Sequence, residues 1–215
     1  MYRNFICFKE VTQVTCICQT NTFCYDQVVH HFHNDGLFAL EEQFVGNLAA
    51  GKTAAFLTIE NGTPINGDLS RIKELADQGV CCITLVWNGD YEIGSGHTTE
   101  KGLTEFGKAV VTEMEKQGIL IDVSHLNDAG FADLLKVATK PFIATHSNAR
   151  SVCGHKRNLT DDMIREMVKR DCLIGLNYFV KFLEDDGVVD SLDSLYRHIE
   201  HFFALGAQKN LALGS

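Results

Sequence analysis

Short apolar runs alternate with polar, helix-like stretches from residue 53 to residue 215, and this alternation constrains the fold more than any other feature. The runs contain few polar residues, which is typical of parallel strands covered by helices on both faces. They predict six strands, at 53–61, 80–88, 119–125, 141–146, 172–178 and 210–215. The stretches between them predict five helices, at 68–79, 103–118, 128–139, 161–170 and 191–206.

Two folds contain such a repeat, a doubly wound α/β sheet and a (β/α)8 TIM-type barrel. Residues 1–52 form a divergent N-terminal part that adds one strand, at 11–23, and brings the total to seven. A barrel would therefore be one strand short. A chain of 215 residues can bury one core, so we expect a single domain over 1–215, with its motifs in 53–215.

Charge and hydropathy exclude several classes of protein. The formal net charge of -9 disfavours an electrostatic grip on nucleic acid or anionic lipid. No apolar run reaches the length of a bilayer span, and residues 1–13 lack the profile of a secretory signal. We therefore expect a soluble cytoplasmic protein with no nucleic-acid or membrane partner.

The spacing of the cysteines indicates a packing role and not a metal-binding or redox role. Cys16 and Cys18, like Cys81 and Cys82, lie in β-like runs and lack Cys-x-x-Cys spacing. Buried thiols are therefore expected, and not a zinc knuckle or a redox pair. No glycine-rich nucleotide motif and no Gly-x-Ser-x-Gly elbow follows any of the predicted strands.

Side chains suited to metal binding lie where predicted strands end. The run ILIDVSH ends at His125, PFIATH ends at His146, and Glu60 lies near the end of the first run. Loops at the carboxyl ends of parallel strands converge on one rim, so these groups should meet there. Alone, each would be read as a rim charge or a loop hydrogen bond. Together, a carboxylate and two imidazoles suit zinc or a similar divalent ion.

Five segments resemble, in order, the renal-type (membrane) dipeptidase family, peptidase family M19, and its bacterial branch in particular. They are FLTIENG, ITLVWN, GLTEFGKAVVTEMEKQGILIDVSHLND, PFIATHSNARSVCGHKRNLTDDMI and LIGLNY. The similarity covers about residues 50–215, and the HSNARSVCGHKRNLTDDMI stretch is its most specific part. It implies a (β/α)8 barrel with two zinc ions at the rim and dipeptides as substrates.

The resemblance also implies residue roles. Glu60 would bridge the two zinc ions, His125 and His146 would ligate one of them, and Arg157 would receive the substrate carboxylate. Two cations lower the pKa of a bridging water and polarise the peptide carbonyl, and a guanidinium fork selects substrates with a free C-terminus. Without the motif, Arg157 would be read as a surface residue ahead of the Thr160 helix cap.

The sequence departs from the family pattern at both ends. Family members carry His-x-Asp ligands on the first strand, and His33 and Asp35 have this spacing. They lie in a helix-like segment only 25 positions before Glu60, however, so we interpret them as solvated helix residues. The catalytic aspartate of the family would follow Ser215. These departures predict an incomplete barrel that lacks the first strand and the segment after the last.

Two functions remain open from the sequence. The first is a zinc-dependent dipeptidase acting through a metal-bridging hydroxide, with one or two ions bound. The second is a non-catalytic family remnant that acts as a binding or scaffold protein. An open barrel would expose two strand edges, which favours a homodimer. Substrate contacts also differ from renal members, where a histidine replaces Trp87 and a tyrosine replaces Phe182.

Overall fold

The structure, a computed structural model, describes residues 57–188 and 192–214. Within them six strands form one parallel sheet in the order β1-β2-β3-β4-β5-β6. Their bounds are Leu57–Glu60, Val80–Thr84, Leu120–Asp122, Ile143–Ala144, Leu173–Leu176 and Leu211–Leu213. All six predicted strands of the motif-bearing part are thus confirmed, each shorter than its apolar run. The predicted strand at 11–23, together with His33 and Asp35, lies outside the described residues.

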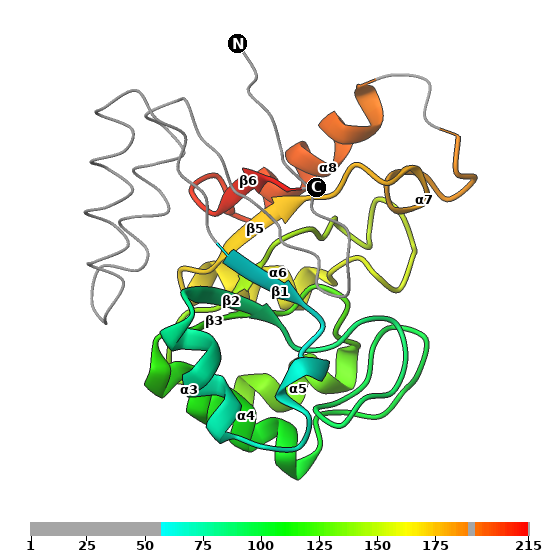
Figure 1. The fold of residues 1–215 in the computed structure, drawn as a ribbon. Helices are drawn as coiled ribbons and strands as arrows, with labels where there is room; N and C mark the ends of the chain where they lie inside the picture. Colours follow the sequence, from blue (N-terminus) through cyan, green and yellow to red (C-terminus); the bar gives the residue numbers. More distant parts are fainter. Residues whose placement is uncertain (1–56, 189–191, 215) are drawn as a thin grey trace.

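Helices connect the strands as predicted. The main helices are α3 (Ser70–Asp77), α4 (Glu105–Gln117), α5 (Asp128–Val137), α6 (Asp161–Lys169) and α8 (Asp193–Ala204). Two short helices were not predicted, η1 (Thr63–Ile65) and α7 (Val180–Leu183). Helices α3, α4 and α5 pack side by side beside β1, β2 and β3 (Figure 1). No helix in the described part of the chain is long and apolar enough to span a membrane.

Side-chain caps fix where several helices begin. The Asn127 amide oxygen accepts the Gly130 N–H at 2.8 Å at the start of α5, and the Thr160 hydroxyl accepts the Met163 N–H, which confirms the predicted Thr160 cap. The residue before α3, Leu69, makes no side-chain cap bond. Asp68 instead accepts the Ser70 N–H at 2.9 Å, a local turn contact typical of aspartate.

The two faces of the sheet have different neighbours, because successive strand residues point to opposite sides. Ile59, Ile83 and Ile121 belong to the main hydrophobic core with the helices. Glu60 pairs with Thr84, and Thr84 pairs with Asp122, so these three side chains share the other face. The polar residues of β1, β2 and β3 are therefore gathered on the face away from the helices.

Glycines in β5 and directly after β6 let the backbone at Thr145 approach closely. A side chain added at Gly175 or Gly214 would collide with the carbonyl oxygen of Thr145, so only glycine fits at either position.

The described thiols behave as predicted: Cys81 and Cys82 are buried and free, and burial raises the pKa of the Cys81 thiol to about 12. Cys16 and Cys18 lie outside the described residues.

Candidate metal centre

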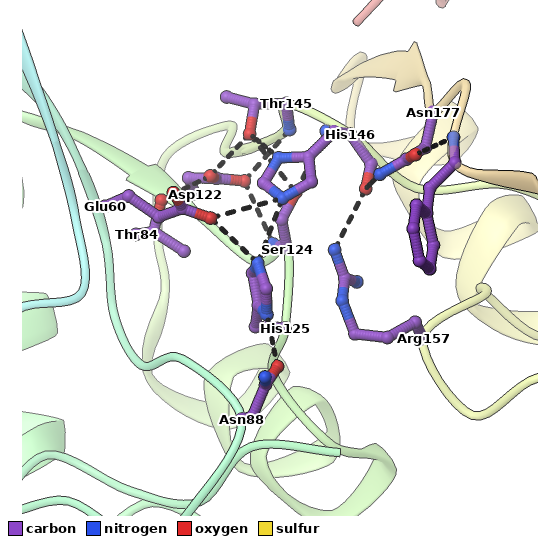
Figure 2. A network of polar contacts seen from close by, with 11 residues as sticks. Glu60, Thr84, Asn88, Asp122, Ser124, His125, Thr145, His146, Arg157 and Asn177 are labelled. Carbon is purple, nitrogen blue, oxygen red and sulfur yellow. Dashed lines mark hydrogen bonds and ion pairs between the residues drawn. The ribbon is translucent and has the colours of Figure 1, made fainter. Parts of the chain in front are cut away.

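The three predicted ligand side chains meet at one point. Glu60 ends β1, His125 follows β3 and His146 follows β4, as the rim argument requires. The His125 Nε2 atom lies 2.9 Å from Glu60 Oε1 and 3.0 Å from His146 Nε2. His146 Nε2 lies 3.5 Å from Glu60 Oε1. One ligand atom from each residue therefore falls within 4.8 Å of the others, close enough to share one metal ion (Figure 2).

Backbone geometry at His125 helps to aim its ring. The residue adopts φ of 72°, a left-handed conformation that costs a non-glycine residue roughly 1–2 kcal/mol. A tight turn holds it, because the Leu126 N–H donates to the Val123 carbonyl at 3.0 Å. Strain of this kind is retained where the surrounding structure enforces it, and it gathers at functional sites.

Hydrogen bonds on the far side of each imidazole leave Nε2 free to bind a cation. His125 Nδ1 lies 3.0 Å from the Asn88 amide oxygen, which can only accept. The hydrogen of His125 is therefore on Nδ1, and the Nε2 lone pair faces Glu60. His146 Nδ1 lies 2.7 Å from the Thr145 hydroxyl (Figure 2). Two nitrogen lone pairs and a carboxylate oxygen directed at one point make a site that a cation would stabilise. The donor set thus fits a divalent metal ion.

The protonation states also suit metal binding. Burial alone raises the pKa of Glu60, but its contacts with His125 and His146 outweigh burial and lower this pKa to about 2. Burial lowers the pKa of His125 to about 4, against the opposing effect of Glu60. At neutral pH the carboxyl group is ionised and the His125 imidazole is neutral, the forms that ligate metals.

Arg157 lies beside this cluster and is only 4% exposed, so the alternative interpretation as a surface residue, which would hold without the motif, is excluded. Its Nη2 donates to the His146 carbonyl at 3.1 Å, and its Nε has no hydrogen-bond partner among the described residues. Burial lowers the pKa of the guanidinium to about 10, while the charges of Asp122 and Glu60 act in the opposite direction. A buried cation with an unused donor has the chemistry needed to hold an anion.

The family model of membrane dipeptidase, peptidase family M19, matches residues 23–215. This chain belongs to the membrane dipeptidase family. Two curated bacterial relatives support the assignment. An uncharacterised protein in the pqqA 5′ region of Klebsiella pneumoniae is 33% identical over 168 residues, 73% of this chain and 62% of that protein. Another, in the PQQ-III 3′ region of Acinetobacter calcoaceticus, is 26% identical over 200 residues, 88% of this chain and 64% of that protein.

Solved structures of the dipeptidase family share the fold. A metallopeptidase from Rhodobacter sphaeroides, bound to a phosphinate mimic of L-Ala-D-Ala, has a TM-score of 0.77 and 29% identity, over 81% of this chain and 53% of that one. The dipeptidase AC, a metallopeptidase of family M19, has the same TM-score and identity and is covered to 55%. These similarities confirm the predicted parallel, TIM-barrel-like fold. The chain spans about three fifths of the curated relatives and about half of these two structures.

Further residues of this dipeptidase-family site were not singled out from the sequence. Asp122, Ser124 and Thr145 form a hydrogen-bonded layer beneath His146 (Figure 2). His97 and His155 lie together at the rim, with ring centroids 5.6 Å apart. The sequence does contain a signal for Asp122, because it is a charged residue inside the apolar run ILIDV. A carboxylate buried in such a run needs hydrogen-bond partners.

Two rim residues that differ from renal members are also placed by the structure. Trp87 follows β2, is 47% exposed, and lies with its ring centroid 6.1 Å from that of His125. The Phe182 ring lies 5.4 Å from the Arg157 guanidinium carbon and covers one face of the cation. Trp87 thus lies beside the Glu60–His125–His146 cluster, and Phe182 lies beside the buried Arg157.

Proposed function

We propose that this protein is a zinc-dependent dipeptidase whose metal ligands include Glu60, His125 and His146. The observation that carries the proposal is the convergence of three lone-pair donors beside a buried arginine with an unused donor. Family membership and the dipeptide mimic bound by the Rhodobacter sphaeroides relative support a dipeptide substrate.

Zinc is favoured by the chemistry of the donor set. Two imidazole nitrogens and one carboxylate oxygen match the borderline ligands that zinc prefers, whereas magnesium and calcium favour oxygen alone. Glu60 has a second carboxylate oxygen with which to reach a second ion, as the family pattern implies. When bound, zinc polarises the scissile carbonyl and lowers the pKa of water. The number of ions in this chain is one of the quantities to be measured.

The residues of the chain bind and orient the substrate around that metal. Arg157 would hold the C-terminal carboxylate of a dipeptide through its guanidinium fork, because its buried charge has no paired carboxylate at hydrogen-bond distance among the described residues. Asn88 fixes the His125 ring, which keeps the Nε2 lone pair directed at the metal. A fixed distance between the arginine and the metal would then select short peptides.

The experiment measures zinc content and dipeptide hydrolysis on the same purified preparations. The wild-type chain should retain zinc after dialysis, and Glu60→Gln and His146→Ala should lose most of it. Hydrolysis of unmodified dipeptides, followed by amine release, should disappear with the metal. Asp77→Asn, on the exposed face of α3, serves as the matched charge-removal control and should change neither quantity. A wild-type chain that takes up no zinc at high free metal would refute the proposal.

The second candidate, a binding or scaffold protein, is distinguished by the same measurements. It predicts that zinc or a dipeptide binds without turnover. Dipeptide hydrolysis that depends on Glu60 and is lost with a chelator would exclude it.

A further inference from the structure

We propose that Asp122 and Thr145 are positioning residues that fix the imidazole tautomer of His146, so that its Nε2 lone pair is presented to the metal. The proposal deepens the function proposed above and rests on it for the identity of the bound ion. The position of the ring hydrogen can nevertheless be measured without any metal.

The first step is the buried carboxylate. Asp122 has no exposed surface, and its Oδ1 accepts the backbone N–H groups of Ser124 and Thr145, both at 2.9 Å. Backbone N–H groups can only donate, so Oδ1 is an acceptor. Its Oδ2 lies 2.6 Å from two hydroxyl oxygens, those of Thr84 and Thr145. Four donors thus surround one carboxylate, and they keep it ionised despite its burial.

The second step is the direction of the Thr145 hydroxyl. A hydroxyl has one hydrogen, and Thr145 directs it to the charged Oδ2 of Asp122. Only lone pairs of Thr145 Oγ1 then remain for His146 Nδ1, 2.7 Å away. This contact is a hydrogen bond only if Nδ1 carries the hydrogen. The neutral ring consequently has its free lone pair on Nε2, the atom nearest Glu60 and His125.

The third step is the backbone of the same histidine. The His146 N–H donates to Ser124 Oγ at 3.0 Å, and Ser124 is itself held by Asp122. One buried carboxylate therefore controls the main chain and, through Thr145, the ring of His146. Which nitrogen of an imidazole is free to bind a metal is set by the hydrogen bond that the other nitrogen makes.

Thr84 provides an internal control for this arrangement. Its hydroxyl donates to the same oxygen of Asp122 at the same 2.6 Å, but no hydrogen bond joins it to any histidine in residues 57–188 or 192–214. Replacing Thr84 or Thr145 by valine removes one donor from the carboxylate in each case. Only the replacement of Thr145 also removes the acceptor for His146.

The decisive experiment reads the tautomer of His146 by long-range ¹H–¹⁵N correlation in metal-free protein with labelled histidine, and His146→Gln identifies the signal. Wild type, Thr84→Val and Thr145→Ser should all show hydrogen on Nδ1. Thr145→Val should move the hydrogen to Nε2. Asp122→Asn should do the same, because its NH₂ would donate to Thr145 and turn the threonine hydrogen toward His146.

A second measurement reads the consequence for the metal. Competition with a chromophoric chelator should give about 10- to 100-fold weaker zinc binding for Thr145→Val and Asp122→Asn, the usual effect of losing an outer hydrogen bond. Thr84→Val and Thr145→Ser should stay within about threefold of wild type on that scale. Backbone amide spectra verify folding, and Thr145→Ala replaces Thr145→Val if the latter is unfolded.

Three results would overturn the proposal: hydrogen on Nε2 of His146 in the wild type, an unchanged tautomer in Thr145→Val, or equal effects of Thr84→Val and Thr145→Val. Equal effects of the two valine variants would mean that each threonine acts only as a donor to the Asp122 carboxylate, and that Thr145 does not set the tautomer of His146. Absence of zinc binding in the wild type would refute the proposed function, while the tautomer measurement would still decide the role of Asp122 and Thr145.

Discussion

Arg157 and His125 are each in an energetically unfavourable state: one is a buried charge, the other a non-glycine residue with a left-handed backbone. The arginine side chain is buried with one hydrogen bond to the residues that the structure describes, and the histidine has a left-handed backbone. Both lie where a substrate and a metal would use them, which is the distribution expected of strain and burial at a functional site. The sequence singled out His125 by its place at the end of a predicted strand, and Arg157 through the family motif. Their burial and backbone geometry depend on contacts far apart in the chain, which a pattern does not show.

Arg157 gives the prediction that belongs to the residue scale. Arg157→Gln should lower kcat/KM for dipeptides roughly 10- to 100-fold, since a hydrogen bond to a charged group contributes ~1.5–3 kcal/mol. The measurement compares each dipeptide with its C-terminal amide. Wild type should strongly prefer the free carboxylate, and the variant should lose most of that preference. Equal discrimination by both proteins would show that another group reads the carboxylate.

Elements were predicted in type and order, but their ends were not. The run 141–146 forms only a two-residue strand, Ile143–Ala144, because the Thr145 N–H turns to the Asp122 carboxylate. The helix α7 has four residues, too few for any periodicity to be seen. Strand alternation gives the two sets of side chains that point to opposite faces. It does not say which face the helices cover, so it could not place Asp122 and Thr84 on the other one. Local pattern therefore specifies the elements, and long-range hydrogen bonds specify the site.

Asn127 shows how one cap can organise a whole connection. Besides capping α5, its amide donates to the carbonyls of Thr99 and Lys101 at 2.9 and 2.6 Å, and so fastens the long loop after β2. Asn127→Ala should lower the free energy of unfolding by about 2–4 kcal/mol, the sum of a cap and of polar groups left unpaired. Thr160→Ala removes only a cap and should cost about 1 kcal/mol. Urea denaturation measures both, and equal costs would contradict the fastening role.

At the scale of the whole molecule, the described residues form one continuous sheet whose helix-covered face makes the core. The other face carries Glu60 and Asp122, and His125 and His146 follow strands at the same rim. This division explains why the family motif is spread over some hundred residues yet meets at one point, since each strand contributes one or two side chains. That residues 1–215 form a single domain, and that two copies associate, stay predictions. The number of metal ions likewise stays a prediction.

The pH dependence of the free energy of unfolding tests whether the buried histidines stay neutral in the folded protein. His198 has no exposed surface; its Nδ1 accepts the Ala149 N–H at 3.1 Å and its Nε2 lies 3.2 Å from the Leu183 carbonyl. Burial is the main cause that lowers its pKa below 6.5, as it also is for His97 and His125. Below pH 6.5 the unfolded chain therefore binds more protons than the native one, and acidification removes stability.

In metal-free protein the free energy of unfolding should accordingly fall as the pH drops from 7 to 5. Glu60 and Asp122, whose pKa values are lowered, contribute only at more acidic pH and do not affect this interval. His198→Gln keeps a donor and an acceptor but cannot take up a proton, so its stability should fall less steeply between pH 7 and 5. Above pH 7 the curves for the two proteins should run parallel, which separates this effect from a general loss of packing. Urea unfolding in chelator at half-unit pH steps gives both slopes, and equal slopes below pH 7 would mean that His198 accepts its proton without leaving the core.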